Sequence, residues 1–110
     1  ERYDRLFLEA GLQLQTPYVG AEGTSVYAQY AVLVNDRDRL QNSLTENGIP
    51  TAVHYPEPMH QQQVVKGKSC SDELFPVAED VSKQILCLPM HPYLSPEDQE
   101  KVVSAFKAEM

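Results

Sequence analysis

Basic residues are scarce in this 110-residue sequence. Sixteen aspartate and glutamate residues outnumber nine lysine and arginine residues, so the formal net charge is −7 with neutral histidine. Because this excess of negative charge repels phosphates, the composition argues against nucleic acid or an anionic membrane as a partner. An anionic substrate would have to find its positive charges on another domain.

Long hydrophobic runs are also absent. No stretch approaches the ~18 apolar residues that a membrane-spanning helix needs, and the start shows no secretory signal pattern. We therefore expect a cytoplasmic protein. The 42% hydrophobic and 23% charged residues suit one globular domain with a real core, over residues 1–110. Because the sequence opens on Glu1 within a predicted helix, we expect a fragment of a longer protein.

The usual motifs of metal, nucleotide and thiol chemistry are missing as well. Cys70 and Cys87 form no CxxC pair, and His54, His60 and His91 show no HxH or HExxH spacing. No Walker loop or GxGxxG segment occurs. We expect no metal site and two reduced thiols, with Cys70 in a loop and Cys87 a small buried core residue rather than a nucleophile.

Predicted helices and strands alternate along the chain. Apolar spacing and end signals predict four helices, over residues 1–10, 37–47, 76–86 and from 96 onward. Strands are expected at 12–17, 26–34 and 51–55, with 87–92 as a brief edge strand or extended connection. This order predicts an α/β fold, a small sheet of three or four strands with helices packed on it.

Several side chains have expected places in this fold. The strand over 26–34 has no charged residue on either side, which favours burial of both faces, with Tyr27 and Tyr30 on opposite faces as core aromatics. Asp36, together with the asparagine before it, offers an N-cap oxygen to the second helix. Ser95 offers one to the last helix.

The most distinctive stretch is Gly-Ile-Pro-Thr-Ala-Val-His-Tyr-Pro-Glu-Pro-Met-His, which ends at His60. Pro56 and Pro58 fix φ at alternate positions, so the backbone around them is stiff and extended. His54, Tyr55 and His60 therefore lie on or beside a rigid arm at the end of a predicted strand. The residues alone leave two interpretations open, a proline-shaped turn with satisfied hydrogen bonds or a binding site.

Four ordered motifs resemble one known family. These are Val-Tyr-Ala-Gln-Tyr at 26–30, Gly-Ile-Pro-Thr-Ala-Val-His-Tyr-Pro at 48–56, Phe-Pro-Val-Ala-Glu at 75–79 and Leu-Pro-Met-His-Pro-Tyr-Leu at 88–94. Together they resemble the C-terminal domain of the DegT/DnrJ/EryC1/StrS sugar aminotransferases, pyridoxal-phosphate enzymes of fold type I that aminate nucleotide-linked keto-sugars. Within that family the similarity is greatest to the enzymes that aminate UDP-2-acetamido-2-deoxy-3-oxo-glucuronate for O-antigen, a lipopolysaccharide component.

The resemblance implies that substrate contacts and coenzyme binding belong to different domains. His54 and Tyr55 match residues that line the sugar-nucleotide pocket, whereas pyridoxal phosphate and the catalytic lysine belong to a large N-terminal domain. Residues 1–10 would be the end of a helix leading in from that domain. The family also implies a homodimer and glutamate as amino donor. We therefore expect this chain alone to be inactive, with no catalytic, cofactor-binding or metal-binding residue of its own.

The sequence departs from the family pattern beside the arm. Met59 replaces a leucine, and three glutamines at 61–63 replace Leu-Gln-Pro, so the course of the following loop is open. Two other classes of protein also remain. One is a non-enzymatic α/β module for ligand binding or oligomerisation, and the other is a stand-alone enzyme that uses His54.

Overall fold

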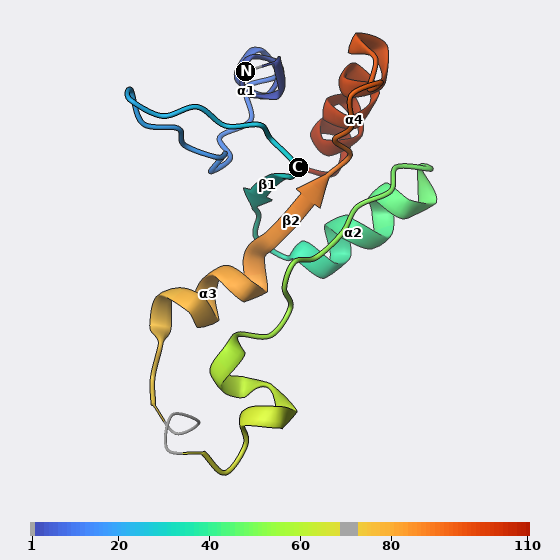
Figure 1. Ribbon diagram of the computed structural model, residues 1–110. Helices are drawn as coiled ribbons and strands as arrows, with labels where there is room; N and C mark the ends of the chain where they lie inside the picture. The colour runs from blue at the N-terminus through green and yellow to red at the C-terminus, as the bar shows by residue number, and fades with distance from the viewer. Residues whose placement is uncertain (1, 69–72) are drawn as a thin grey trace.

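The computed structural model describes residues 2–68 and 73–110 (Figure 1). Cys70 lies outside these residues, and so does its predicted loop position. The elements in chain order are α1 (Arg2–Glu9), β1 (Tyr30–Leu33), α2 (Arg37–Glu46), the 3₁₀ helices η1 (Met59–Gln61) and η2 (Gln63–Val65), α3 (Pro76–Gln84), β2 (Ile85–Leu88) and α4 (Pro96–Glu109). The α/β class is confirmed. None of the helices in the described ranges is long and apolar enough to cross a membrane.

The sheet is narrower than the sequence predicts. β1 and β2 pair antiparallel from Tyr30 opposite Leu88 to Leu33 opposite Ile85, and these are the two strands within the described residues. The expectation of three or four strands is not confirmed. Each predicted outer strand is reduced to a single bridge, one between residues 15 and 33 and one between residues 52 and 87.

Two prolines stop the pairing of Ala52 with β2 from extending toward the start of the chain. Ala52 and Cys87 exchange both backbone hydrogen bonds, with N–O distances of 3.1 and 2.8 Å. In this antiparallel register the next hydrogen-bonded pair toward the start would be Pro50 and Pro89. Neither proline has an N–H to donate, so the ladder stops after one pair.

β1 begins four residues later than predicted. Tyr27 has a left-handed backbone with a φ of 46°, and Val26 is 92% exposed, so the chain is not yet a strand there. The rings of Tyr27 and Tyr30 lie 6.1 Å apart, which makes the prediction of opposite faces wrong. In β1 itself Tyr30 and Val32 are buried while the residues between them are half-buried, so one face is fully covered rather than both.

α2 is confirmed, but its predicted N-cap is not. Leu40 and Leu44 are fully buried as expected, and Gly48 ends the helix with a φ of 74°. Asp36 has a left-handed backbone and makes no capping hydrogen bond. Its carboxylate instead accepts a hydrogen bond from Arg39 Nε at 3.2 Å, which fixes the side chain away from the helix end.

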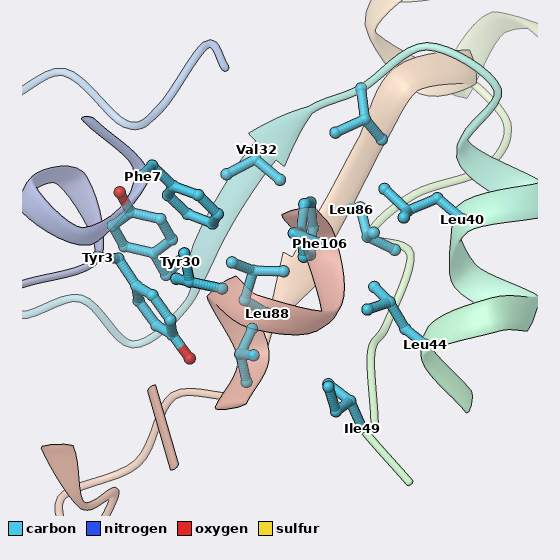
Figure 2. Packing of buried hydrophobic residues seen from close by; sticks show 13 residues of the cluster. Tyr3, Phe7, Tyr30, Val32, Leu40, Leu44, Ile49, Leu86, Leu88 and Phe106 are labelled. Carbon is cyan, nitrogen blue, oxygen red and sulfur yellow. The ribbon is translucent and has the colours of Figure 1, made fainter. Parts of the chain in front are cut away.

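α1 and α4 close the core from the same side (Figure 1). The Phe7 and Phe106 rings meet edge to face with centroids 5.4 Å apart, and Tyr3 packs on Tyr30 at 4.9 Å (Figure 2). Ser95 caps α4 as predicted, because its Oγ accepts the Asp98 N–H at 3.0 Å. The core is Tyr3, Phe7, Tyr30, Val32, Val34, Leu40, Leu44, Ile49, Leu86, Leu88, Val102, Val103 and Phe106.

α3 differs most from its prediction. It ends at Gln84 rather than residue 86, and the chain passes without a loop into β2 at Ile85. The segment 87–92, predicted as an edge strand or connection, therefore begins within β2. β2 pairs with β1 on one side and forms the bridge to residue 52 on the other. Ser82 is the buried residue of α3, while Val77 is 76% exposed. The apolar side of α3 therefore lies outside the core.

Candidate functional site

The candidate site is built around residues 52–60, a segment outside the α-helices and β-strands that bends at 54, 56 and 57 before η1, and which we call the arm. The arm leaves the sheet at Ala52, the residue bridged to β2, and ends in η1. Its backbone is extended at Pro58, with φ −65° and ψ 154°, as the proline spacing predicts. In Figure 1 the arm runs from the sheet toward the two 3₁₀ helices beside α3.

His54 and Tyr55 are presented to the surface from this arm. Both side chains are exposed, Tyr55 to 71%, and their rings lie 5.4 Å apart. Within the described residues neither side chain makes a hydrogen bond to the protein. One imidazole and one phenol are thus free to donate or accept hydrogen bonds, and their binding of a substrate stays a prediction.

His60 does not join them, contrary to the grouping inferred from the sequence. Its side chain is buried, with the ring 4.7 Å from the ring of Phe75. Its Nε2 lies 2.9 Å from Oε1 of Glu79 on α3. This partner occupies one side of the imidazole and Phe75 covers the ring, so His60 joins the arm to α3, and it lines the hollow between them.

Glu79 is the residue that sequence reasoning missed. Its Oε1 accepts the backbone N–H of Phe75 at 3.2 Å as well as meeting His60. These contacts, first the Phe75 amide and then His60, hold the pKa of the Glu79 carboxyl below its ordinary value. The available signal was an acidic residue in the first turn of a helix, where it can reach back to an unpaired N–H.

Two hollows of different chemistry flank His54. The first, which we call the apolar cleft, has a volume of about 430 Å³ and lies between the arm and α3. Its apolar walls come from Pro58, Met59, Phe75, Ala78, Val81 and Ile85, and the polar residues His54, Tyr55, Glu57, His60, Gln62 and Ser82 also line it. The second, which we call the polar hollow, has about 440 Å³ and brings His54 together with Gln29, Thr51, Cys87 and His91.

The polar hollow combines the side chains of Gln29, Thr51, His54 and His91 with apolar residues such as Ala28, Leu88 and Met90. No lysine, arginine, aspartate or glutamate is among its lining residues in the described chain. His91 is exposed, and its Nδ1 accepts the Tyr93 N–H at 3.2 Å, which leaves Nε2 for other partners. Cys87 is a buried free cysteine, as predicted, and burial raises the pKa of its thiol. It is therefore not an activated nucleophile.

A third hollow is larger but has no residue of the arm. It encloses about 960 Å³ between the loop at 47–50 and the first half of α4. Its walls include the carboxylates Glu97, Asp98 and Glu100. Because it lacks His54 and Tyr55, its size does not make it the candidate site.

No lysine of the described residues lies at the two hollows beside the arm. The five described lysines, at 66, 68, 83, 101 and 107, are all exposed, and none lines the apolar cleft or the polar hollow. A Schiff-base lysine needs a positioned site with donors for the phosphate. The described chain also holds no group of three histidine, cysteine, aspartate or glutamate residues that could bind a metal ion.

Comparison with known proteins connects this architecture to sugar aminotransferases. The sequence profile of the DegT/DnrJ/EryC1/StrS aminotransferase family matches residues 1–107. The UDP-2-acetamido-2-deoxy-3-oxo-D-glucuronate aminotransferase of Pseudomonas aeruginosa is 40% identical over 92 residues, which are 84% of this chain and 24% of that protein. The UDP-N-acetyl-3-dehydro-alpha-D-glucosamine aminotransferase of Acidithiobacillus ferrooxidans is 33% identical over 88% of this chain and 26% of its own.

Solved structures give the same picture. A DegT DnrJ EryC1 StrS aminotransferase from Brucella abortus matches with a TM-score of 0.85 and 34% identity, over 98% of this chain and 28% of that one. S. venezuelae DesV, solved with a ketimine intermediate, matches with a TM-score of 0.83 and 28% identity, over 98% of this chain and 31% of its own. The chain therefore spans about a quarter to a third of the length of these proteins.

Proposed function

Because this chain belongs to the DegT/DnrJ/EryC1/StrS aminotransferase family, we propose that it is the C-terminal domain of a pyridoxal-phosphate-dependent sugar aminotransferase. The observation that carries the proposal is the family match over residues 1–107. The enzyme would transfer an amino group from glutamate to a nucleotide-linked keto-sugar in the cytoplasm. The 40% identity to the Pseudomonas aeruginosa enzyme supports a UDP-linked 3-oxo-glucuronate, and with it a role in O-antigen synthesis.

The coenzyme belongs to the rest of the polypeptide in this proposal. Pyridoxal phosphate, when bound, supplies the electron sink for amino transfer, and a large N-terminal domain would hold it. The described chain is instead suited to hold the substrate. His54 and Tyr55 offer exposed hydrogen-bonding groups, and the polar hollow beside His54 can receive uncharged hydroxyl and amide groups of a sugar.

The apolar surface beside the cleft suits a protein partner rather than a sugar. Leu74, just before α3, is 85% exposed, Val77 on α3 76% and Met59 on the arm 79%, so this region leaves apolar side chains in water. Surfaces of this kind mark sites of protein contact. We propose that the N-terminal domain covers this surface, in a homodimeric enzyme.

The test uses the full-length protein. His54→Ala or Tyr55→Phe should lower kcat/KM for the keto-sugar by about tenfold to a few hundredfold, equal to ~1–3 kcal/mol for a hydrogen bond that is no longer made. The half-reaction with the amino donor should stay near normal, and stopped-flow absorbance of the coenzyme measures both half-reactions separately. Tyr18→Phe is the matched control, because Tyr18 is 90% exposed and borders neither hollow.

Two results would contradict the proposal. If both half-reactions slow equally, His54 and Tyr55 maintain the structure and do not bind the sugar. If the unmodified full-length protein transfers no amino group to any nucleotide-linked keto-sugar, the non-enzymatic α/β module becomes the better description. For the 110-residue chain alone, a stoichiometric, borohydride-trappable adduct of pyridoxal phosphate at one lysine would also overturn the proposed division of labour.

A further inference from the structure

The arm is fastened to the molecule at two points, and His54 and Tyr55 lie between them. The first point is Ala52, which exchanges two backbone hydrogen bonds with Cys87 of β2. The second is His60, which meets Glu79 of α3. Since α3 continues directly into β2, both points lie on one unbroken segment of the chain.

The second point is held by several contacts rather than one. The His60 side chain is 8% exposed and that of Glu79 25%, so their 2.9 Å contact is largely shielded from water. The same Glu79 oxygen accepts the Phe75 N–H at 3.2 Å, and the Phe75 ring covers the imidazole at 4.7 Å. A partly buried hydrogen bond with an ionised acceptor is stronger than an exposed neutral one.

α3 itself is fastened to the core at its other end. Arg37, at the start of α2, is buried, and its Nη1 donates to the carbonyl oxygens of Ser82 at 3.1 Å and Ile85 at 3.2 Å. These carbonyls belong to the last turn of α3 and the first residue of β2. Glu79 therefore stands on a helix that cannot shift freely against the core.

We propose that His60 and Glu79 are positioning residues, which fix the far end of the arm so that His54 and Tyr55 meet the substrate in one orientation. This inference rests on the proposed function. The prolines at 56 and 58 restrict φ within the arm but do not set where its far end goes. Without the pair, the arm keeps its contacts with Cys87, through the Ala52 bridge and the His54 backbone, but its far end loses its polar contact with α3.

The test compares variants of the full-length enzyme. Glu79→Ala should lower kcat/KM for the keto-sugar about tenfold, mainly through a higher KM, and leave the amino-donor half-reaction unchanged. Glu79→Gln, which keeps an oxygen that can accept both hydrogen bonds, should stay within about threefold of the unmodified enzyme. Asp80→Ala is the matched control, because Asp80 is the exposed neighbouring acid on α3 and should change neither value.

A double-mutant cycle separates positioning from a general loss of structure. If Glu79 acts through His54 and Tyr55, Glu79→Ala should cost almost nothing further in an enzyme that already has His54→Ala and Tyr55→Phe. A full tenfold loss in that background would overturn the proposal. If Glu79→Ala does not fold, His60→Leu gives the same comparison, since leucine fills the space beside Phe75 without a donor.

A second readout does not depend on enzyme activity. Hydrogen exchange of the backbone amides in residues 59–66 should be several-fold faster in Glu79→Ala than in Asp80→Ala. The hydrogen bonds of these turns, such as the 3.0 Å bond from the Gln61 N–H to the Pro58 carbonyl, lie beside His60 and should open more often without its partner. Faster exchange in a protein without transaminase activity would refute the proposed function and support the positioning pair. An active enzyme whose Glu79→Ala and Asp80→Ala variants match in both readouts would refute the pair.

Discussion

α3 and α4 look alike in the sequence and differ in the structure. Each begins with proline at its first position and has acidic residues in its first turn and a lysine in its last. α4 buries Gln99, Val102, Val103 and Phe106, whereas α3 buries Ser82. α4 has a side-chain N-cap in Ser95, and α3 has none.

The difference shows that apolar spacing predicts a helix but not what covers it. The apolar side chains of α4 meet α1 and α2, and those of α3 face the arm and the apolar cleft. α3 thus has the pattern of a packed helix without a complete partner in the described chain. Four measurements test whether the two helices differ in this way.

The largest expected effect is on the α4 side. Phe106→Ala removes a fully buried ring that packs against Phe7, and should lower the free energy of unfolding by ~3–5 kcal/mol. Denaturant unfolding of this chain measures it. Phe75→Ala, at a ring that is 39% exposed beside α3, is the comparison and should cost clearly less. Equal losses would mean that the α3 side belongs to the same core.

The next effect concerns the cap of α4. Ser95→Ala removes the acceptor of the Asp98 N–H and should cost ~1 kcal/mol in denaturant unfolding. Ser104→Ala makes the same change at an exposed position within α4 and should be near neutral or slightly stabilising. If the two variants were equally stable, the hydrogen bond at the helix start would contribute nothing.

A smaller effect is expected on the exposed side of α3. Val77→Ser should change the unfolding free energy of this chain by no more than ~0.5 kcal/mol, because Val77 is 76% exposed. Val102→Ser, which puts a hydroxyl into the core, is the contrasting variant and should be strongly destabilising. A loss above ~1 kcal/mol for Val77→Ser would show that the α3 surface is already covered in this chain.

The smallest expected effect is a change in how folding stability depends on pH. The pKa of Glu79 is lowered in the folded state, first by the Phe75 N–H and then by His60, with Lys83 also nearby. The folded state therefore binds this proton less readily than the unfolded state. The stabilisation that the ionised Glu79 carboxylate gives is present above about pH 4.3 and is lost as the pH falls through the folded pKa. The stability difference from Glu79→Gln should shrink below that pH, and a constant difference from pH 3 to 7 would contradict the contact.

Helices could be predicted from the sequence because their signals are local. The caps, glycines and apolar spacing around Leu40, Leu44 and Phe106 lie within one or two turns of chain, and the structure confirms these helices within a residue or two. Strand length could not be predicted in the same way. It depends on which residue comes opposite, and the meeting of Pro50 with Pro89 joins segments far apart in the sequence.

The candidate site was predictable to a similar degree. Proline spacing drew attention to His54 and Tyr55, which the structure leaves exposed, and Pro58 has the extended backbone expected there. It could not show that His60 turns inward. Its partner Glu79 lies 19 residues further along the chain, and no local pattern encodes that contact.

The contact between α1 and α4 has a consequence for biosynthesis. The Phe7 ring needs the Phe106 ring to cover it, and the Tyr3 hydroxyl donates to the carbonyl oxygen of Pro89 at 3.0 Å. Both partners are made long after α1, so a ribosome adding about 5–20 residues per second leaves the aromatic side of α1 uncovered for several seconds. During that interval the aromatic side of α1 stays exposed, and emergence of α4 from the ribosome is the step that allows it to be covered.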